Sequence, residues 1–346
     1  MIKIVTSMLL LSVSLLQAQD NSVNIHMPKV PEVPKVEAVV PKLTIINAPT
    51  SQTNAEIVAN ATKDKTVVFS NRVAPFMLHK DENINKDANK TIEVGDINNG
   101  KVTAYLHAPL MSTQEVQKVL ESAGFNILTT YKVDKKGLVT SLVFTNEAIQ
   151  KAAAKTNRGF ASTLRVTVDT KDRLISISNP IYLMKAFMQE EYDAQLAEKT
   201  LRTLRESFTT LENSTELVKF RILKHFKFME GMPTYNDMIH IKKASNETLL
   251  QRAKKSKKLL YSQTLANGSI VVGVKLSKRT TKFIKKTGYQ NAGLLPYPVL
   301  IENGEVKILD PKYYIAVMYP TLKMSQFMKI ATVPGAITKD IDKIFR

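Results

Sequence analysis

Residues 164–183, LRVTVDTKDRLISISNPIYL, and residues 295–314, LPYPVLIENGEVKILDPKYY, follow one pattern. Each segment has two β-branched or apolar runs around a short polar turn, and each then reaches a proline that follows Asn179 or Asp310. Such runs predict two antiparallel strands joined by a hairpin turn. The chain therefore predicts the same piece of structure twice.

The match between the two halves of the chain extends well beyond these segments. An offset of 131 residues aligns about fifty residues without a gap, and an offset of 133 aligns the stretch before them. The matching pairs include Gly137/Gly268, Lys151/Lys282, Leu164/Leu295, Ile177/Ile308, Pro180/Pro311, Tyr182/Tyr313, His107/His240 and Ser112/Ser245. Scattered identities in a constant frame indicate a duplication, and a unit of over about 100 residues predicts tandem domains instead of a solenoid.

The first copy predicts an order of strand, helix, four strands with a helix among them, and a final helix. Ser112-Thr113-Gln114-Glu115 is a capping box that starts the first helix, and Gly124 stops it. A long final helix is expected to run through Tyr192, Leu196, Leu201, Leu204, Phe208 and Leu211. The predicted strands are 102–108, 126–133, 138–145, 164–168 and 174–178, and the inserted helix is 147–156.

The second copy resembles the domain of unknown function 302 family in its Leu294-Leu295-Pro296 segment, its acidic-Gly turn around Gly304 and its Asp310-Pro311 pair. The resemblance implies an α+β fold of two tandem TBP-like domains, each a curved antiparallel sheet covered by helices on one face. It implies no settled activity. The chain departs from the family where cysteines are usual, because Arg165, Tyr297 and the run 144–147 stand near those places.

The start of the chain predicts export. Lys3, the apolar run 8–16 and Ala18 have the layout of a secretory signal, although a buried helix or a retained anchor stays open. We therefore expect an exported, periplasmic protein with no transmembrane span after signal cleavage. The predicted domains are a signal peptide (1–18), a Pro-rich linker (19–42), a poorly structured lead-in (43–100), a first domain (101–217) and a second, strongly basic domain (218–346).

The composition excludes several kinds of site. The 346 residues include no cysteine, which excludes a disulfide framework, a thiolate metal site and a cysteine nucleophile. The formal net charge is +18, and residues 218–346 hold 24 Lys+Arg against 8 Asp+Glu. Nearly all of the excess positive charge therefore belongs to the predicted second domain, which is where an electrostatic function is expected.

Two helices predicted in the second domain carry the strongest functional signal. If both cover the same side of the sheet, their cations share one face that attracts an anionic envelope surface or an acidic protein partner. A solvated surface that only aids solubility is the alternative. The predicted anion- or partner-binding residues are Arg252, Lys254, Lys255, Lys257, Lys258, Lys278, Arg279, Lys282, Lys285 and Lys286.

A second hypothesis places a small-ligand or enzymatic site in a cleft between the domains, formed by His107, His240, Tyr182 and Tyr313. Imidazoles can bind metals or move protons, but no further ligand lies at a suitable spacing, so no metal or cofactor is expected. No known catalytic motif is present. Nucleic acid is not an expected partner of an exported protein whose basic helices lack interleaved aromatic residues for stacking bases. The sequence thus favours a non-enzymatic binding or scaffold protein, and it leaves the oligomeric state open.

Overall fold

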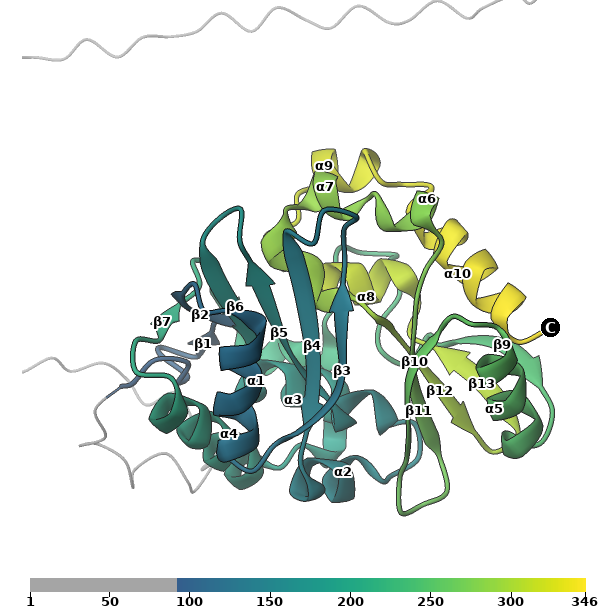
Figure 1. Ribbon diagram of the computed structural model, residues 1–346, viewed down its shortest axis with the longest axis horizontal. Coiled ribbons are helices and arrows are strands. Elements are labelled where there is room, and N and C mark those ends of the chain that lie inside the picture. The colour runs from purple at the N-terminus through teal and green to yellow at the C-terminus, as the bar shows by residue number, and fades with distance from the viewer. Residues whose placement is uncertain (1–91) are drawn as a thin grey trace, which may run out of the picture. The chain divides into compact units, whose positions relative to one another are not determined.

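The computed structural model describes residues 92–346, which belong to one compact unit (Figure 1). The predicted signal peptide, the Pro-rich linker and residues 43–91 of the predicted lead-in lie outside the described residues. The fold is α+β, with two antiparallel sheets and helices packed on them. Below, residues 92–217 are called the first half and residues 218–346 the second half.

Six strands of the first half form the first sheet, in the order β3-β4-β5-β6-β2-β7. All neighbouring strands are antiparallel. Their bounds are β3 (Asn126–Lys132), β4 (Val139–Thr145), β5 (Leu164–Asp169), β6 (Leu174–Ser178), β2 (Tyr105–Pro109) and β7 (Glu212–Asn213). A separate strand pair joins β1 (Lys101–Val102) to β8 (Val218–Lys219).

Five strands of the second half form the second sheet, in the order β10-β11-β12-β13-β9. Their bounds are β10 (Leu259–Thr264), β11 (Ile270–Val274), β12 (Tyr297–Glu302), β13 (Glu305–Ile308) and β9 (Ile239–Lys243). This strand order repeats the order β3-β4-β5-β6-β2 of the first sheet. In each half the first long strand pairs with the last long strand, which is β2 with β6 in the first half and β9 with β13 in the second. The tight turn at Asn303-Gly304, both with positive φ, joins β12 to β13.

Local signals in the sequence start the helices. The predicted capping box is present, with Ser112 and Glu115 at the start of α1 (Thr113–Ser122). Asn179 and Asp310 cap α3 (Pro180–Met188) and α8 (Pro311–Met318), each of which has proline at its first position. The other helices of four or more residues are α2 (Glu147–Ala153), α4 (Ala194–Ser207), α5 (Asn246–Lys255), α6 (Lys278–Thr281), α7 (Ile284–Thr287), α9 (Met324–Met328), α10 (Val333–Ile344) and the 3-10 helices η1 (Gly159–Ser162), η3 (Phe220–His225) and η4 (Tyr289–Leu294).

Two predicted helices differ from those observed. The final helix of the first half runs from Ala194 to Ser207 and is therefore shorter at both ends than expected, and the 3-10 helix η2 (Gln189–Glu191) lies between it and α3. Asp193 then caps α4 with its side chain. The basic helix predicted around Phe283 consists of the short helices α6 and α7, and Gly288 ends the second of them at φ +95°.

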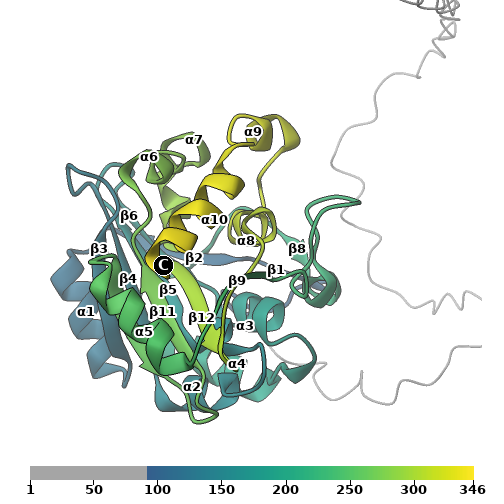
Figure 2. The ribbon, with the colours of Figure 1, turned by 90° about the vertical axis from the view of Figure 1, so that its right-hand side faces the viewer.

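The outer face of each sheet is covered by helices of the same half. Val116 and Leu120 of α1 are buried beside β3 and β4, and α4 packs against α1 and α3. In the second half Leu249 and Ala253 of α5 are buried near β12 and β13, and α10 contacts β9. Figure 2 shows α5 and α10 on the near side of the second sheet. Apolar burial between these layers is the main stabilising term of each half.

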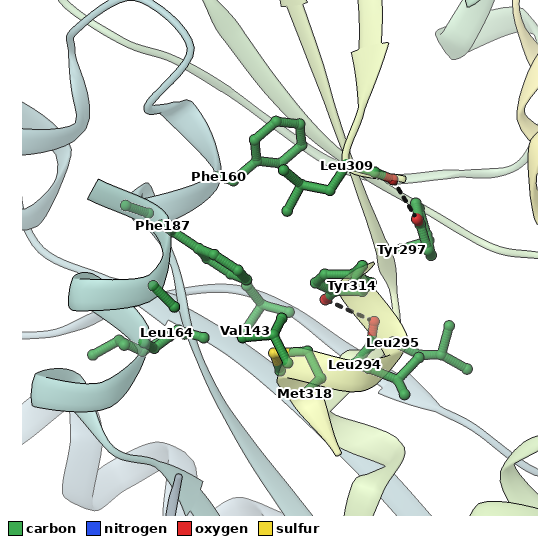
Figure 3. Close-up of a cluster of buried hydrophobic side chains, with 14 of the residues drawn as sticks. Val143, Phe160, Leu164, Phe187, Leu294, Leu295, Tyr297, Leu309, Tyr314 and Met318 are labelled. Carbon is green, nitrogen blue, oxygen red and sulfur yellow. Dashed lines mark hydrogen bonds between the residues drawn. The ribbon is translucent and has the colours of Figure 1, made fainter. Parts of the chain in front are cut away.

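The inner face of each sheet is covered by the other half of the chain. The 3-10 helix η1 lies against β11 and β12, and η4 lies against β4, β5 and β6. A Cβ on Gly159 of η1 would lie 2.6 Å from Leu300 Cδ1, and one on Gly293 of η4 would lie 3.1 Å from Thr167 Oγ1. Figure 3 shows that buried side chains from both halves, such as Phe187 and Tyr314, meet in a single cluster.

We expect Gly159→Ala to destabilise the protein. Its new methyl group would overlap Leu300 and Val271 of the other half, and such overpacking costs about 1–3 kcal/mol. Gly335→Ala is the matched control, because it adds the same methyl group to α10 with no atom within 4 Å and is expected to leave stability equal or slightly higher. Urea unfolding monitored by circular dichroism measures both. Equal stability of the two variants would contradict close packing of η1 on the second sheet.

Candidate functional site

The ten predicted cations lie at one end of the second sheet in two groups. The first group occupies the C-terminal end of α5 and the start of β10, and the second group follows β11 on α6 and α7. The groups meet where Lys275 N donates a 2.8 Å hydrogen bond to Lys258 O. Helix α5 lies on the outer face of the sheet, whereas α6 and α7 lie beyond the end of β11. We call the ten residues together with Lys275 the basic surface.

The cations of the basic surface have few partners. Of the ten predicted residues, only Arg252 is half-buried, and the other nine are exposed. Arg252 Nη1 donates to Phe345 O at 3.2 Å, and Lys286 Nζ donates to Lys329 O at 2.8 Å. The other eight side chains make no hydrogen bond or ion pair with any residue between 92 and 346. Their charges are therefore available to an external anion.

Two carboxylates of α10 are already engaged. Asp340 of α10 accepts a 2.8 Å hydrogen bond from Ser277 N at the start of α6, and Asp342 pairs with Arg346. Elsewhere, Arg205 of α4 pairs with both Glu93 and Asp96, and Lys224 pairs with Glu190.

The two predicted tyrosines meet at the centre of the interface between the halves. Tyr182 of α3 donates a 2.7 Å hydrogen bond to Val317 O of α8, and Tyr313 of α8 donates a 3.2 Å bond to Ala186 O of α3. Both rings are buried, and burial raises the pKa of both hydroxyls well above 10.0. The two hydrogen bonds are equivalent in the two halves. Tyr313 lies 131 positions after Tyr182, and the acceptor Val317 lies 131 positions after the acceptor Ala186.

The two predicted histidines lie apart from the tyrosines. His107 of β2 is half-buried between Ser176 and Glu212, and burial lowers its pKa although Glu216 and Glu212 oppose the change. His240 of β9 is exposed, and its Nδ1 lies 2.7 Å from Glu305 Oε2. Among the described residues no hydrogen bond joins either histidine to the other or to the tyrosine pair.

A polar connection on the second sheet also crosses between the halves. Lys307 and Glu302 form a buried ion pair of 3.0 Å. Asn157 N donates to both carboxylate oxygens of Glu302 at 3.1 Å, and Lys307 Nζ donates to Asn157 Oδ1 at 2.8 Å. Tyr235 OH completes the contact by donating to Asn157 O at 2.5 Å. One residue of the first half is thus held through its N–H, its C=O and its side chain.

A buried polar face on the first sheet was not predicted from the sequence. Arg165, Thr167 and Asp169 alternate along β5 with Val166 and Val168 and point toward the second half. Arg165 is 1% exposed, and all three nitrogens of its guanidinium lack a hydrogen-bond partner among the described residues. The alternation of polar and apolar residues in 164–169 is the signal that could have indicated two different faces.

A groove of about 600 Å³ lies between residues 92–94 and the end of α4, where Arg202, Arg205 and Phe208 line it. It contains none of the residues predicted for a site. Within residues 92–346, no group of three or more His, Asp or Glu side chains could hold a metal ion. The helices of the same range include none with the length and apolar character needed to span a membrane.

Comparison with known proteins found no match of the chain to a protein-family model, to a curated protein or to a solved structure.

The buried tyrosines predict a steep loss of stability at alkaline pH. Burial raises the pKa of Tyr105, Tyr182, Tyr235, Tyr261, Tyr297, Tyr313 and Tyr314 above 10.0, and the pKa of Tyr314 is about 12. A tyrosine whose pKa is higher in the folded than in the unfolded protein contributes its full stabilisation below pH 10. This stabilisation is lost as the pH rises from 10 through the pKa of the folded state. The free energy of unfolding should fall by about 1.4 kcal/mol per pH unit for each such tyrosine.

Urea unfolding at increasing pH, combined with the ultraviolet absorbance of tyrosinate, measures this loss. Tyr182→Phe combined with Tyr313→Phe removes two of these tyrosines. The double variant should therefore lose less unfolding free energy per pH unit, by the contribution of two tyrosines. Gradual appearance of tyrosinate near pH 10 in a protein that stays folded would contradict the burial of these hydroxyls.

Proposed function

We propose that the protein is an exported, non-enzymatic binding or scaffold protein whose basic surface contacts a phosphate-bearing surface of the cell envelope. The observation that carries the proposal is the set of eight exposed cations that have no partner among the described residues. An acidic protein is the other partner that such a surface could recognise.

We also infer that the two halves are tandem copies of one TBP-like module, in keeping with the resemblance to the domain of unknown function 302 family. Three observations support this inference: the repeated strand order, the proline-started helices α3 and α8 after the last strand, and the reciprocal hydrogen bonds of Tyr182 and Tyr313. Under this proposal the copies share a fold and differ in surface charge, so only the second presents a basic surface.

The location proposed for this function is the periplasm, which rests on the signal-like residues 1–18. An anionic lipid surface attracts each nearby Lys or Arg by about 1 kcal/mol, and a charge excess concentrated in one half also steers encounters. Helices α5 and α6 carry lysines at the same end of the second sheet. Lysines held on helices at one end favour simultaneous contact with several lipid headgroups.

A ligand-binding or enzymatic site built from His107, His240, Tyr182 and Tyr313 is the weaker candidate function. Both tyrosine hydroxyls are already used as donors to backbone carbonyls, and neither histidine contacts them within the described residues. A catalytic base needs an orienting partner beside a reacting group.

Reversal of Lys254, Lys255, Lys282 and Lys286 to Glu should abolish binding to anionic vesicles. Loss of four attractive charges removes about 4 kcal/mol, which corresponds to about a thousand-fold weaker binding. Cosedimentation with vesicles of phosphatidylcholine and phosphatidylglycerol measures the change, and vesicles of phosphatidylcholine alone give the background.

The matched control reverses Lys118, Lys135, Lys136 and Lys151, four exposed lysines of the first half, and alters the formal charge equally. We expect it to bind nearly as the wild type does. Equal weakening of both variants would mean that net charge matters and the basic surface does not. Unchanged vesicle binding by the first variant, with loss of cross-linking to an envelope protein, would assign the surface to an acidic protein partner.

A further inference from the structure

Arg165 lies where the two halves cover each other. It stands on β5 opposite Val143, and its backbone N–H donates to Ser178 Oγ at 2.9 Å. A Cβ on Gly293 of η4 would lie 4.0 Å from both Arg165 Cβ and Tyr105 Cε1, so η4 passes directly over this part of the sheet. The side chain of Arg165 is therefore enclosed between the first sheet and elements of the second half.

The guanidinium of Arg165 has no counter-charge. None of its three nitrogens forms a hydrogen bond with a described residue, and no ion pair of residues 92–346 includes it. Arginine stays protonated in proteins, and taking an unpaired ion out of water costs several kcal/mol. In contrast, the buried Lys307 is paired with Glu302 and held by Asn157. The same interface thus contains one neutralised buried cation and one that is not neutralised.

Other unpartnered polar groups lie around this guanidinium. Tyr261 of β10 is 5% exposed, and Thr163 lies beside its hydroxyl. Neither hydroxyl makes a hydrogen bond of normal distance and angle with a described residue. Burial raises the pKa of Tyr261, whereas the charge of Arg165 and the hydroxyl of Thr163 lower it in part. Gln263, two residues along β10, also leaves both of its amide atoms unpartnered.

The position of Tyr261 depends on a glycine. A Cβ on Gly273 would lie 2.0 Å from Tyr261 Cε1, so the ring lies across the backbone of β11. This placement carries the hydroxyl over the strand toward Thr163 and Arg165 of the other half. A guanidinium whose five N–H donors have no acceptor among the described residues, beside two hydroxyls that interact only with each other, is complementary to an oxyanion.

We propose that the guanidinium of Arg165, with the hydroxyls of Tyr261 and Thr163, forms a buried binding site for a small oxyanion, the carboxylate or phosphate group of a ligand held between the two halves. The site is separate from the basic surface and requires both halves. Because the guanidinium is fully buried, the anion enters when β10 and η4 move away from β5 and is enclosed when they return. Binding therefore stabilises the closed interface.

Thermal unfolding of the protein in sodium acetate, sodium phosphate and sodium chloride at equal ionic strength tests the proposal. An anion at about a hundred times its Kd should raise the Tm of the wild type by at least about 5 °C relative to chloride. A larger shift with acetate assigns a carboxylate, and a larger shift with phosphate assigns a phosphate. Arg165→Met, which keeps the volume and removes the charge, should lose this difference between salts.

Two further variants make the outcome decisive. Tyr261→Phe combined with Thr163→Val keeps the charge of Arg165 and should reduce the shift even if Arg165→Met does not fold. Reversal of Lys254, Lys255, Lys282 and Lys286 to Glu should leave the shift intact, whereas Arg165→Met should leave vesicle binding intact, so the two proposals fail separately. Equal shifts of wild type and Arg165→Met in every salt, or a wild type that responds equally to chloride and to both oxyanions, would overturn the oxyanion site.

Discussion

Each sheet of this protein has two faces to bury, and the helices of its own half cover only one. The reciprocal placement of η1 on the second sheet and η4 on the first covers the remaining faces. At the centre of this contact Tyr182 and Tyr313 each donate a hydrogen bond to the helix that carries the other. Because buried hydroxyls and carbonyls are costly when unpaired, separation of the halves would expose apolar surface and break these bonds together.

The polar chemistry of the interior follows from this mutual covering. Ser141 and Tyr105 of the first sheet donate to Leu295 O and Met318 O of the second half, and Asn157 is held by Glu302 and Lys307. Arg165 is an exception, as are Thr163, Tyr261 and Gln263, because their buried side-chain polar atoms have no partner among the described residues. The interior thus contains one buried cation without a counter-charge among the described residues, whereas the basic surface lies outside it, at the end of the second sheet. The two proposed binding functions use different parts of the fold for this reason.

Local patterns predicted most of the first half. The capping box at Ser112 and the strands on each side of Gly137 act within a few residues, and the structure has α1, β3 and β4 at those places. Helix α3, which starts at Pro180, was not predicted. The end of α3 at Gln189 was not predictable either, because positive φ at a non-glycine residue carries no clear signal in a sequence. The exposed positions of the basic residues agree with their charge. Burial of Arg165 depends on η4, which lies more than a hundred residues away in the chain. The alternation of polar and apolar residues within one strand cannot predict such a long-range contact.

Native-state hydrogen exchange compares the two sheets most directly. If the halves support each other, amides of both sheets should exchange through the same opening reaction, with equal free energies for β4 and β5 and for β11 and β12. These free energies should change together when Tyr182→Phe and Tyr313→Phe are introduced. Protection of one sheet at a denaturant concentration at which the other sheet already exchanges freely would show that each half is stable alone, and it would contradict mutual covering as the basis of the fold.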